Sequence, residues 1–345
     1  MSIATNTAIT LARRPVGPPQ VDDFRYTETE VGAVGDGEVL CRTVYLSLDP
    51  YMRGRMNEGP SYVPPAGLHE VMPGGAVSQV VESRFESLAS GDFVMGYTGW
   101  QEYSVSHGAH LRKLDPDFVP ISTALGVLGM PGMTAYVGLD EFGRPAAGET
   151  LVVTAATGAV GSVVGQIGKI KGCRVVGIAG SEEKCRYAQE ELGFDACVSY
   201  RQAGFADSLK VACPDGVDVY WENVGGASFF AALGLLNDHA RIPLCGMISY
   251  YNLTELPQVP DPTPRILRTL LVRRVKLSGF IVFDHQAREQ EFLREMGSWV
   301  RDNKVRYRED IVDGLENAVD AFTGLLQGRN FGKQLIRVSP DPTRG

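Results

Sequence analysis

Apolar runs of strand length alternate with helix-like segments through the second half of the chain. Six runs after Gly148 are rich in β-branched residues and nearly continuous in apolar character: TLVVTAA, RVVGIAG, ACVSY, VDVYWENV, RIPLCGMI and VKLSGFIV. Between them, helical apolar spacing occurs in GSVVGQIGKIKG, SEEKCRYAQEELG and ASFFAALGLLN. Strands that are buried on both faces and joined by helical crossovers form parallel sheets. The pattern therefore predicts an α/β unit with a doubly wound, six-stranded parallel sheet of the Rossmann type.

A different pattern covers residues 37–110. Its apolar runs are short, β-branched and aromatic, and Gly, Pro and Asp clusters separate them: GEVLCRTVYLSL, GGAVSQVVES and GDFVMGYTGWQEYSV. Closely spaced short strands are typical of a small barrel or sandwich. We therefore expect a second, smaller β-rich domain in this part of the chain.

Two further segments set the expected domain boundaries. Helical spacing begins near Ile121, is interrupted at Pro131-Gly132 and resumes at Met133. Residues 314–338 predict one helix, a polar turn and a final strand, which we expect to join the β-rich domain. The predicted division is a β-rich domain at 1–125 with 310–345, and the α/β domain at 126–309.

Composition narrows the classes of partner. A formal net charge of −8 argues against a nucleic-acid or membrane-surface partner, because either would need a basic footprint. No run approaches the ~18 consecutive apolar residues of a membrane span, and the first residues lack the pattern of a secretion signal. We expect a cytoplasmic protein. The six cysteines are scattered without a C-x-x-C pair, so we expect isolated thiols, no disulfide framework and no metal site.

The stretch LVVTAATGAVGSVVGQIGK, residues 151–169, has the layout of a phosphate-binding turn between a strand and a helix. Aligned to the G-x-G-x-x-G fingerprint, Ala156 replaces the first glycine, while Gly158 and Gly161 keep the second and third. A helix starting there directs free N–H groups at an anion. The motif therefore predicts a bound dinucleotide, and the alternative is a turn that merely packs tightly.

The tip of the second strand distinguishes the two nicotinamide cofactors. An NAD site usually has Asp or Glu there, about 20 residues after the fingerprint, to bind the ribose 2′-hydroxyl. This chain has Gly180-Ser181 instead, followed by Lys184 in the next helix. A missing acid and a nearby cation favour a 2′-phosphate, and so NADPH/NADP. The alternative is that Lys184 is an ordinary exposed lysine.

Several segments together resemble a known family, the zinc-independent medium-chain dehydrogenase/reductases. They occur in the expected order over most of the chain: LSLDPYMRGRM, LGMPGMTAY, AATGAVGSVVGQIGKIKGCRVVGIAGSEEK, YWENVGG, CGMISYYN, GFIVFD and GRNFGKQL. The resemblance is to the alkenal double-bond reductase branch, which includes prostaglandin reductases, plant double-bond reductases and bacterial curcumin reductases. GFIVFD and CGMISYYN are most similar to the curcumin reductase group. The resemblance implies a GroES-like β domain beside the Rossmann domain, and a homodimer.

The resemblance also implies which residues bind the cofactor. Gly158, Ala159, Val160 and Gly161 would hold the pyrophosphate, and Gly180, Ser181, Lys184 and Tyr200 would surround the 2′-phosphate. The nicotinamide end would be contacted by Thr134, Asn223, Cys245, Gly246, Ile248, Ser249, Tyr251, Phe280, Ile281, Val282 and Asn330. For Asn330, a turn residue in a Gly-rich loop is the alternative.

The implied reaction is reduction of the C=C bond of an α,β-unsaturated ketone or aldehyde. NADPH would deliver hydride to the β-carbon, and a proton would reach the α-carbon of the enolate, without a metal ion. Tyr251 is expected to orient cofactor and substrate and is a candidate proton donor, and Tyr51 is expected to line the substrate cleft. The alternative for Tyr51 is a core aromatic. If the SYYN segment is extended, Tyr250 points away from Tyr251.

Three other functions are alternatives to double-bond reduction. A quinone oxidoreductase of the same zinc-free branch would differ only in its acceptor. A non-catalytic NADPH-binding protein would bind the cofactor without turnover. A zinc alcohol dehydrogenase would carry a His and Cys ligand set, but the comparable stretch VMPGGAVSQVVES contains neither residue type.

Overall fold

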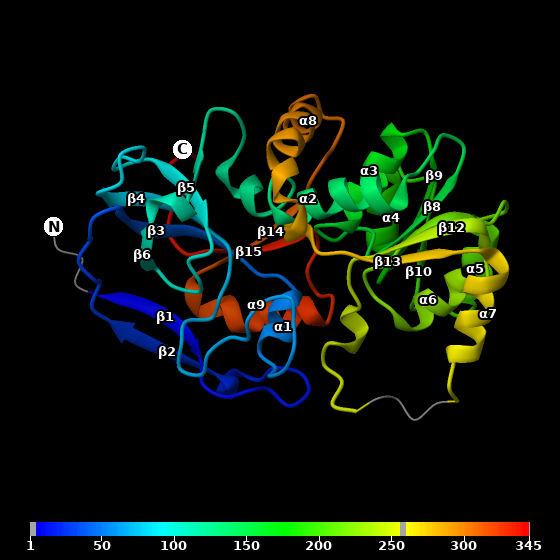
Figure 1. Ribbon diagram of the computed structural model, residues 1–345, viewed down its shortest axis with the longest axis horizontal. Helices are drawn as coiled ribbons and strands as arrows, with labels where there is room; N and C mark the ends of the chain where they lie inside the picture. The colour runs from blue at the N-terminus through cyan, green and yellow to red at the C-terminus, as the bar shows by residue number, and fades with distance from the viewer. Residues whose placement is uncertain (1–4, 256–259, 345) are drawn as a thin grey trace. The chain divides into compact units, whose positions relative to one another are not determined.

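The computed structural model describes residues 5–255 and 260–344. It divides into two compact units, one formed by residues 1–126 with 309–345 and the other by residues 127–308. Each unit has its own sheet and its own core (Figure 1).

The unit of residues 127–308 is built on a six-stranded sheet with the order β10-β9-β8-β11-β12-β13. All of its strand pairs are parallel. The chain runs outward from β8 to β10, returns to the centre and runs outward again from β11 to β13, so the direction reverses between β8 and β11. This is the doubly wound sheet that the apolar runs predicted, and in such sheets ligands bind at the carboxyl ends of the strands. The strands are β8 (Thr150–Thr154), β9 (Arg174–Ala179), β10 (Ala196–Ser199), β11 (Val217–Trp221), β12 (Leu236–Leu244) and β13 (Lys276–Gly279).

Helices cover both faces of this sheet. In Figure 1, α3 and α4 lie on one side, and α5, α6 and α7 lie on the other. The core between these layers consists largely of Val, Ile and Leu from the strands, with Tyr220 among them. The helical segments are α2 (Met130–Val137), η4 (Gly138–Gly143), α3 (Gly161–Ile170), α4 (Glu182–Glu190), α5 (Phe205–Ala212), α6 (Gly226–Leu233), η5 (Ile248–Tyr250), α7 (Thr263–Arg273), η6 (Val282–Arg288) and α8 (Glu289–Arg301).

The other unit contains a seven-stranded sheet with the order β14-β15-β3-β4-β5-β7, with β6 also paired to β3, and a separate β1-β2 pair. The final strand β15 pairs antiparallel with β3, so the prediction that it joins the β-rich domain is confirmed. The strands are β1 (Asn6–Leu11), β2 (Phe24–Thr29), β3 (Glu38–Ser47), β4 (Ala76–Ser83), β5 (Phe93–Gly96), β6 (Tyr103–His107), β7 (Arg112–Leu114), β14 (Glu309–Asp313) and β15 (Lys333–Arg337).

An aromatic cluster fills the core of this unit. Trp100 is fully buried, stacks on Phe24 with ring centroids 5.9 Å apart, and meets Phe322 edge-on at 5.6 Å. The helical segments of the unit are η1 (Val21–Asp23), α1 (Tyr51–Arg55), η2 (Gly108–His110), η3 (Ile121–Leu125), η7 (Leu315–Asn317) and α9 (Ala318–Leu326).

Several element predictions were incomplete. Pro131 does not interrupt a helix: α2 begins at Met130 with Pro131 in its first turn, where a missing N–H is tolerated. The strand expected in VKLSGFIV ends at Gly279, before Phe280. The elements that were not predicted include β1, β2, α1, α5, α7, α8 and β14.

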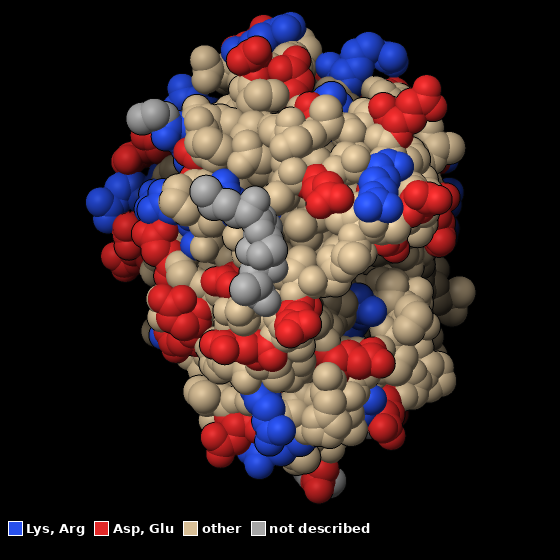
Figure 2. Space-filling model, turned by 90° about the vertical axis from the view of Figure 1, so that its left-hand side faces the viewer, with Lys and Arg blue, Asp and Glu red and all other residues tan. Residues whose placement is uncertain are grey.

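The described residues carry mixed surface charge and free thiols. Acidic and basic side chains are interspersed on the face shown in Figure 2, which has no broad basic area. All six cysteines are free, and Cys41, Cys173, Cys185 and Cys213 are buried. Within the described residues, no helix is long and apolar enough to cross a membrane, and His, Cys, Asp and Glu form no group of three that could hold a metal ion.

Candidate cofactor site and active site

The turn after β8 is shaped by small residues. Ala155 has a positive φ of 49°, so the left-handed position lies one residue before Ala156, which took the place of the first fingerprint glycine. A Cβ on Gly161 would lie 2.3 Å from the carbonyl oxygen of Ala155, and one on Gly158 would lie 3.2 Å from the same oxygen. The chain therefore needs glycine at 161, where α3 begins close against the end of β8.

This turn fits a phosphate group. Among the described residues, the amide N–H groups of Ala159, Val160 and Gly161 have no protein acceptor. They precede or open α3, where the helix dipole adds positive potential. Unpaired N–H groups beside a surface without side chains form the usual cradle for a dinucleotide pyrophosphate.

The tip of β9 brings together the residues expected around the 2′-phosphate. Ser181 caps α4, because its hydroxyl accepts the Lys184 amide N–H at 3.2 Å. The Tyr200 hydroxyl lies over Gly180, where an added Cβ would come within 3.3 Å of it. Gly180 and Ser181 occupy the position of the usual acid, and the nearest carboxylates, those of Glu182 and Glu183, are exposed on the first turn of α4.

One more cation lies at this tip. The Arg201 guanidinium lies 5.7 Å from the centroid of the Tyr200 ring. Sequence reasoning did not select Arg201, although it directly follows Tyr200.

Asn223 follows β11 and is held by protein groups on both sides of its amide. Its Nδ2 donates to the Thr154 carbonyl at 2.6 Å, and its Oδ1 accepts from the Trp221 indole at 3.0 Å. The Asn223 backbone N–H also donates to the Thr154 hydroxyl at 2.8 Å. Asn223 thus joins the carboxyl ends of β8 and β11, at the point where the strand order reverses.

The segment from Cys245 to Tyr251 follows β12 and is not extended. Residues Ile248–Tyr250 form the short helical turn η5, so the alternation argument for Tyr250 and Tyr251 does not apply. The two tyrosines nevertheless point in different directions. The Tyr250 hydroxyl accepts the Gly226 N–H at 2.9 Å. The Tyr251 hydroxyl lies 3.5 Å from the Met247 amide N–H. Burial raises the pKa of the Tyr251 phenol above its ordinary value.

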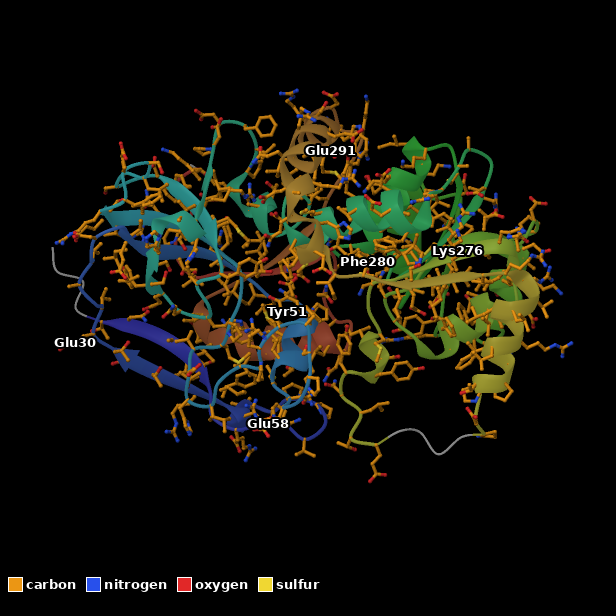
Figure 3. All side chains as sticks on the ribbon, in the orientation of Figure 1. Glu30, Tyr51, Glu58, Lys276, Phe280 and Glu291 are labelled. Atoms are coloured by element: carbon orange, nitrogen blue, oxygen red, sulfur yellow. The ribbon has the colours of Figure 1, made fainter. Side chains whose placement is uncertain are left out.

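Phe280, Ile281 and Val282 follow the end of β13. Phe280, which is labelled in Figure 3, stacks on Phe142 with ring centroids 4.9 Å apart and meets Trp221 edge-on at 5.8 Å. Thr134 lies on α2, where its hydroxyl donates back to the Met130 carbonyl at 2.7 Å. The predicted cofactor residues of this unit therefore lie at the carboxyl ends of the strands, and Thr134 lies on a neighbouring helix.

The other two predicted residues, Tyr51 and Asn330, belong to the β-rich unit. Tyr51 is the first residue of α1 and packs on the aromatic core of its unit (Figure 3). Burial, with a smaller effect of Asp49, raises the pKa of the Tyr51 phenol well above its ordinary value. The Asn330 amide donates to the Gly332 carbonyl at 2.8 Å, the contact expected of a turn residue.

Sequence reasoning missed two residues at the centre of the site, Glu222 and Thr154. Both are buried, and the Thr154 hydroxyl lies 3.0 Å from the Trp221 carbonyl and 3.3 Å from a Glu222 carboxylate oxygen. An available signal was the acid in YWENVGG, because a carboxylate directly after the buried Tyr220 and Trp221 requires dedicated partners.

Two family models match the chain. Residues 7–114 match the model described as the N-terminal domain of oxidoreductase, and residues 159–298 match the model described as zinc-binding dehydrogenase.

The chain has full-length relatives. It is 57% identical to the NADPH-dependent curcumin reductase of Escherichia coli (strain K12) over 96% of each chain. It is 40% identical to prostaglandin reductase 1 of Bos taurus, over 95% of this chain and 98% of the relative. Among solved structures, CurA of Vibrio vulnificus in complex with NADPH superposes with a TM-score of 0.94 at 51% identity, covering 97% of this chain and 100% of the other.

Proposed function

Because the chain belongs to the medium-chain dehydrogenase/reductase family, in the branch of the curcumin and prostaglandin reductases, we propose that it uses NADPH to reduce the C=C bond of α,β-unsaturated ketones and aldehydes. The observation that carries this proposal is the full-length similarity to an NADPH-dependent curcumin reductase. Extended, conjugated enones of the curcumin type are the expected substrates.

Four groups of residues are proposed to hold the cofactor. The turn Gly158–Gly161 binds the pyrophosphate through its unpaired amides. Gly180, Ser181, Lys184 and Tyr200 accommodate the 2′-phosphate, with Lys184 as the cation. Asn223, the segment Cys245–Tyr251 and Phe280–Val282 surround the nicotinamide end. Thr134 and Asn330 remain predicted contacts.

When bound, NADPH supplies the hydride that adds to the β-carbon of the enone. The protein positions the two reactants, excludes water and places donors near the carbonyl oxygen, where negative charge develops. Tyr251 orients the reactants and is the proposed proton donor, because burial keeps its phenol protonated. Tyr51 is the proposed aromatic contact to the substrate from the β-rich unit.

The purified protein should oxidise NADPH in the presence of an enal, an enone or a curcumin-like dienone, with loss of the conjugated absorbance of the substrate. A simple quinone serves as the competing acceptor. A kcat/KM clearly higher for the quinone would favour the quinone oxidoreductase alternative. Binding of NADPH without turnover of either acceptor would indicate a non-catalytic protein, and activity that depends on bound zinc would indicate an alcohol dehydrogenase.

The protein is further proposed to act in the cytoplasm as a homodimer. Six free thiols suit a reducing compartment. On the α/β unit, β13 is an edge strand, and α7 exposes Leu267, Leu271 and Val272. Exposed apolar side chains beside a strand edge are typical of an interface with a second copy.

A further inference from the structure

Glu222 is a buried carboxylate at the carboxyl end of β11. Glu222 is only 1% exposed. One carboxylate oxygen accepts the N–H groups of Val224 at 2.6 Å and Gly225 at 2.9 Å, and the other accepts the Tyr220 hydroxyl at 3.1 Å. These partners are all neutral donors, although a buried carboxylate is usually paired with a cation.

The backbone of Glu222 also joins two strand ends. Its carbonyl oxygen accepts the N–H groups of Cys245 at 2.9 Å and Gly246 at 3.1 Å, just beyond β12. Glu222 therefore fixes the start of the Cys245–Tyr251 segment through its main chain and the turn 223–226 through its side chain.

The shape of the turn 223–226 depends on the hydrogen bonds from two of its amides to the Glu222 carboxylate. Gly225 and Gly226 both have positive φ, of 78° and 58°, so a side-chain acceptor is well suited to hold this conformation. Without that acceptor, the Val224 and Gly225 N–H groups would be left unpaired in a largely buried position.

The same turn holds the segment that carries Tyr251. The N–H of Ile248 donates to the Asn223 carbonyl at 3.1 Å, and that of Ser249 donates to the Val224 carbonyl at 3.0 Å. In the opposite direction, the Gly226 N–H donates to the Tyr250 hydroxyl at 2.9 Å. A displaced turn would therefore displace the η5 segment as well.

We propose that Glu222 is a positioning residue for the nicotinamide end of the site: its carboxylate sets the turn 223–226, and this turn sets the place of residues 246–251, including Tyr251. The proposal rests on the proposed function for the identity of the cofactor. It predicts that Glu222 acts on cofactor affinity and turnover without touching either reactant.

The chain offers conservative variants and a matched control. Glu222→Gln keeps a carbonyl oxygen that accepts the two amide N–H groups, and its NH2 group can donate to the Tyr220 hydroxyl. Glu222→Asp moves the acceptor back by one methylene, and Glu222→Ala removes it. Asp218 lies on the same strand β11, toward its amino end, and accepts the Thr150 N–H at 2.8 Å and the Asn237 amide at 2.9 Å. Asp218→Ala thus removes a half-buried, hydrogen-bonded carboxylate from the opposite end of the same strand.

The measurements are the Kd for NADPH from fluorescence titration, the intrinsic tryptophan emission, the Tm, and kcat and KM with an enone. We expect Glu222→Asp and Glu222→Ala to lose roughly 10-fold or more in kcat/KM, with weaker NADPH binding, because small displacements in a site of this kind have large effects. Glu222→Gln should recover most of the loss. Asp218→Ala should lower the Tm, as most substitutions that remove hydrogen bonds do, and should leave the Kd and kcat/KM close to those of the wild type, because Asp218 lies toward the amino end of β11.

The proposal is overturned if Glu222→Asp binds NADPH and turns over as the wild type does, or if Asp218→Ala loses as much as Glu222→Ala at a matched Tm. Glu222→Asp keeps the test decisive if Glu222→Ala does not fold. Failure of the proposed function would look different, because the wild type itself would then not reduce the enone, while the NADPH affinities would still compare the variants.

Discussion

At the level of a single side chain, we predict that Lys184 gives the site its preference for NADPH over NADH. Its loss should raise the KM for NADPH while changing the KM for NADH little, because only NADPH carries the 2′-phosphate. A charge-assisted hydrogen bond contributes about 1.5–3 kcal/mol, so we expect an increase of roughly 10- to 100-fold for Lys184→Ala. Steady-state kinetics with both cofactors measure it.

Lys169→Ala is the matched control for that variant. Lys169 lies on the last turn of α3, where it pairs with Asp195 at 2.8 Å. Its replacement removes the same charge without affecting the β9 tip. If Lys184→Ala changed both cofactors equally, the 2′-phosphate assignment would be wrong.

If the Tyr251 phenol is the proton donor, its pKa determines the pH dependence that we expect for kcat. Its pKa is raised above the ordinary value of 10.0, so the phenol stays protonated as the pH rises to that value. The kcat of the wild type should therefore show no decline caused by this group up to about pH 9.5, below the ordinary tyrosine pKa.

Tyr251→Phe removes the proposed donor but keeps the ring. We expect kcat to fall roughly 100-fold, within the range of general acid catalysis, with a smaller change in the KM for NADPH. Tyr250→Phe is the comparison, because the Tyr250 hydroxyl accepts the Gly226 N–H and helps to hold the segment in place. Its loss should therefore lower kcat less than the loss of the proposed proton donor. Unchanged kcat and KM in Tyr251→Phe would remove this residue from the mechanism.

At the scale of elements, α3 depends on glycines for its close approach to neighbouring residues. An added Cβ at Gly165 would lie 1.9 Å from the Phe194 ring, whereas one at Gly54 in α1 would meet nothing within 4 Å. Gly165→Ala should therefore lower the free energy of unfolding by about 1–3 kcal/mol, the usual range for overpacking. Gly54→Ala should leave it unchanged or slightly raised. Chemical denaturation of both variants tests the difference.

The sequence predicted elements wherever one pattern dominated. The apolar runs predicted the six-stranded parallel sheet. The signal is clearest for central strands such as β8 and β9, which are buried on both faces, whereas the edge strand β13 is mostly exposed. The helix α7 was missed since its apolar residues Leu267, Leu271 and Val272 are exposed and do not mark a buried face. The turn at 248–250 was missed because its shape depends on hydrogen bonds to residues 223–226, which lie far away in the sequence.

The candidate site, like the fold, was predicted from the sequence only in part. Gly158 and Gly161 could be found because a backbone that approaches a phosphate requires glycine at fixed spacing. Glu222 could not be assigned a role, because the partners of its carboxylate are backbone amides, which every residue has. The left-handed position at Ala155 was equally hidden, since alanine does not signal a positive φ.

On the scale of the whole molecule, the exposed α7 makes the assembly state testable. Leu271 is 79% exposed on α7, and Val211 is 80% exposed on α5. If α7 and β13 form the interface between two copies, Leu271→Glu should convert the dimer to a monomer, because the charge would be buried without a partner. Val211→Glu should leave the dimer intact. Light scattering after size-exclusion chromatography gives both masses, and a wild type that is monomeric would remove the homodimer proposal.

The burial of the thiols matters for an enzyme whose substrates are themselves electrophiles. Conjugated enones alkylate cysteine through its thiolate, yet burial raises the pKa of Cys41 to about 12 and that of Cys173 and Cys213 to about 11. Cys185, whose pKa is lowered by a hydrogen bond with Cys197, is only 7% exposed. These four buried thiols should therefore be protected from alkylation, and we expect the enzyme to survive prolonged exposure to the reactive compounds that it consumes.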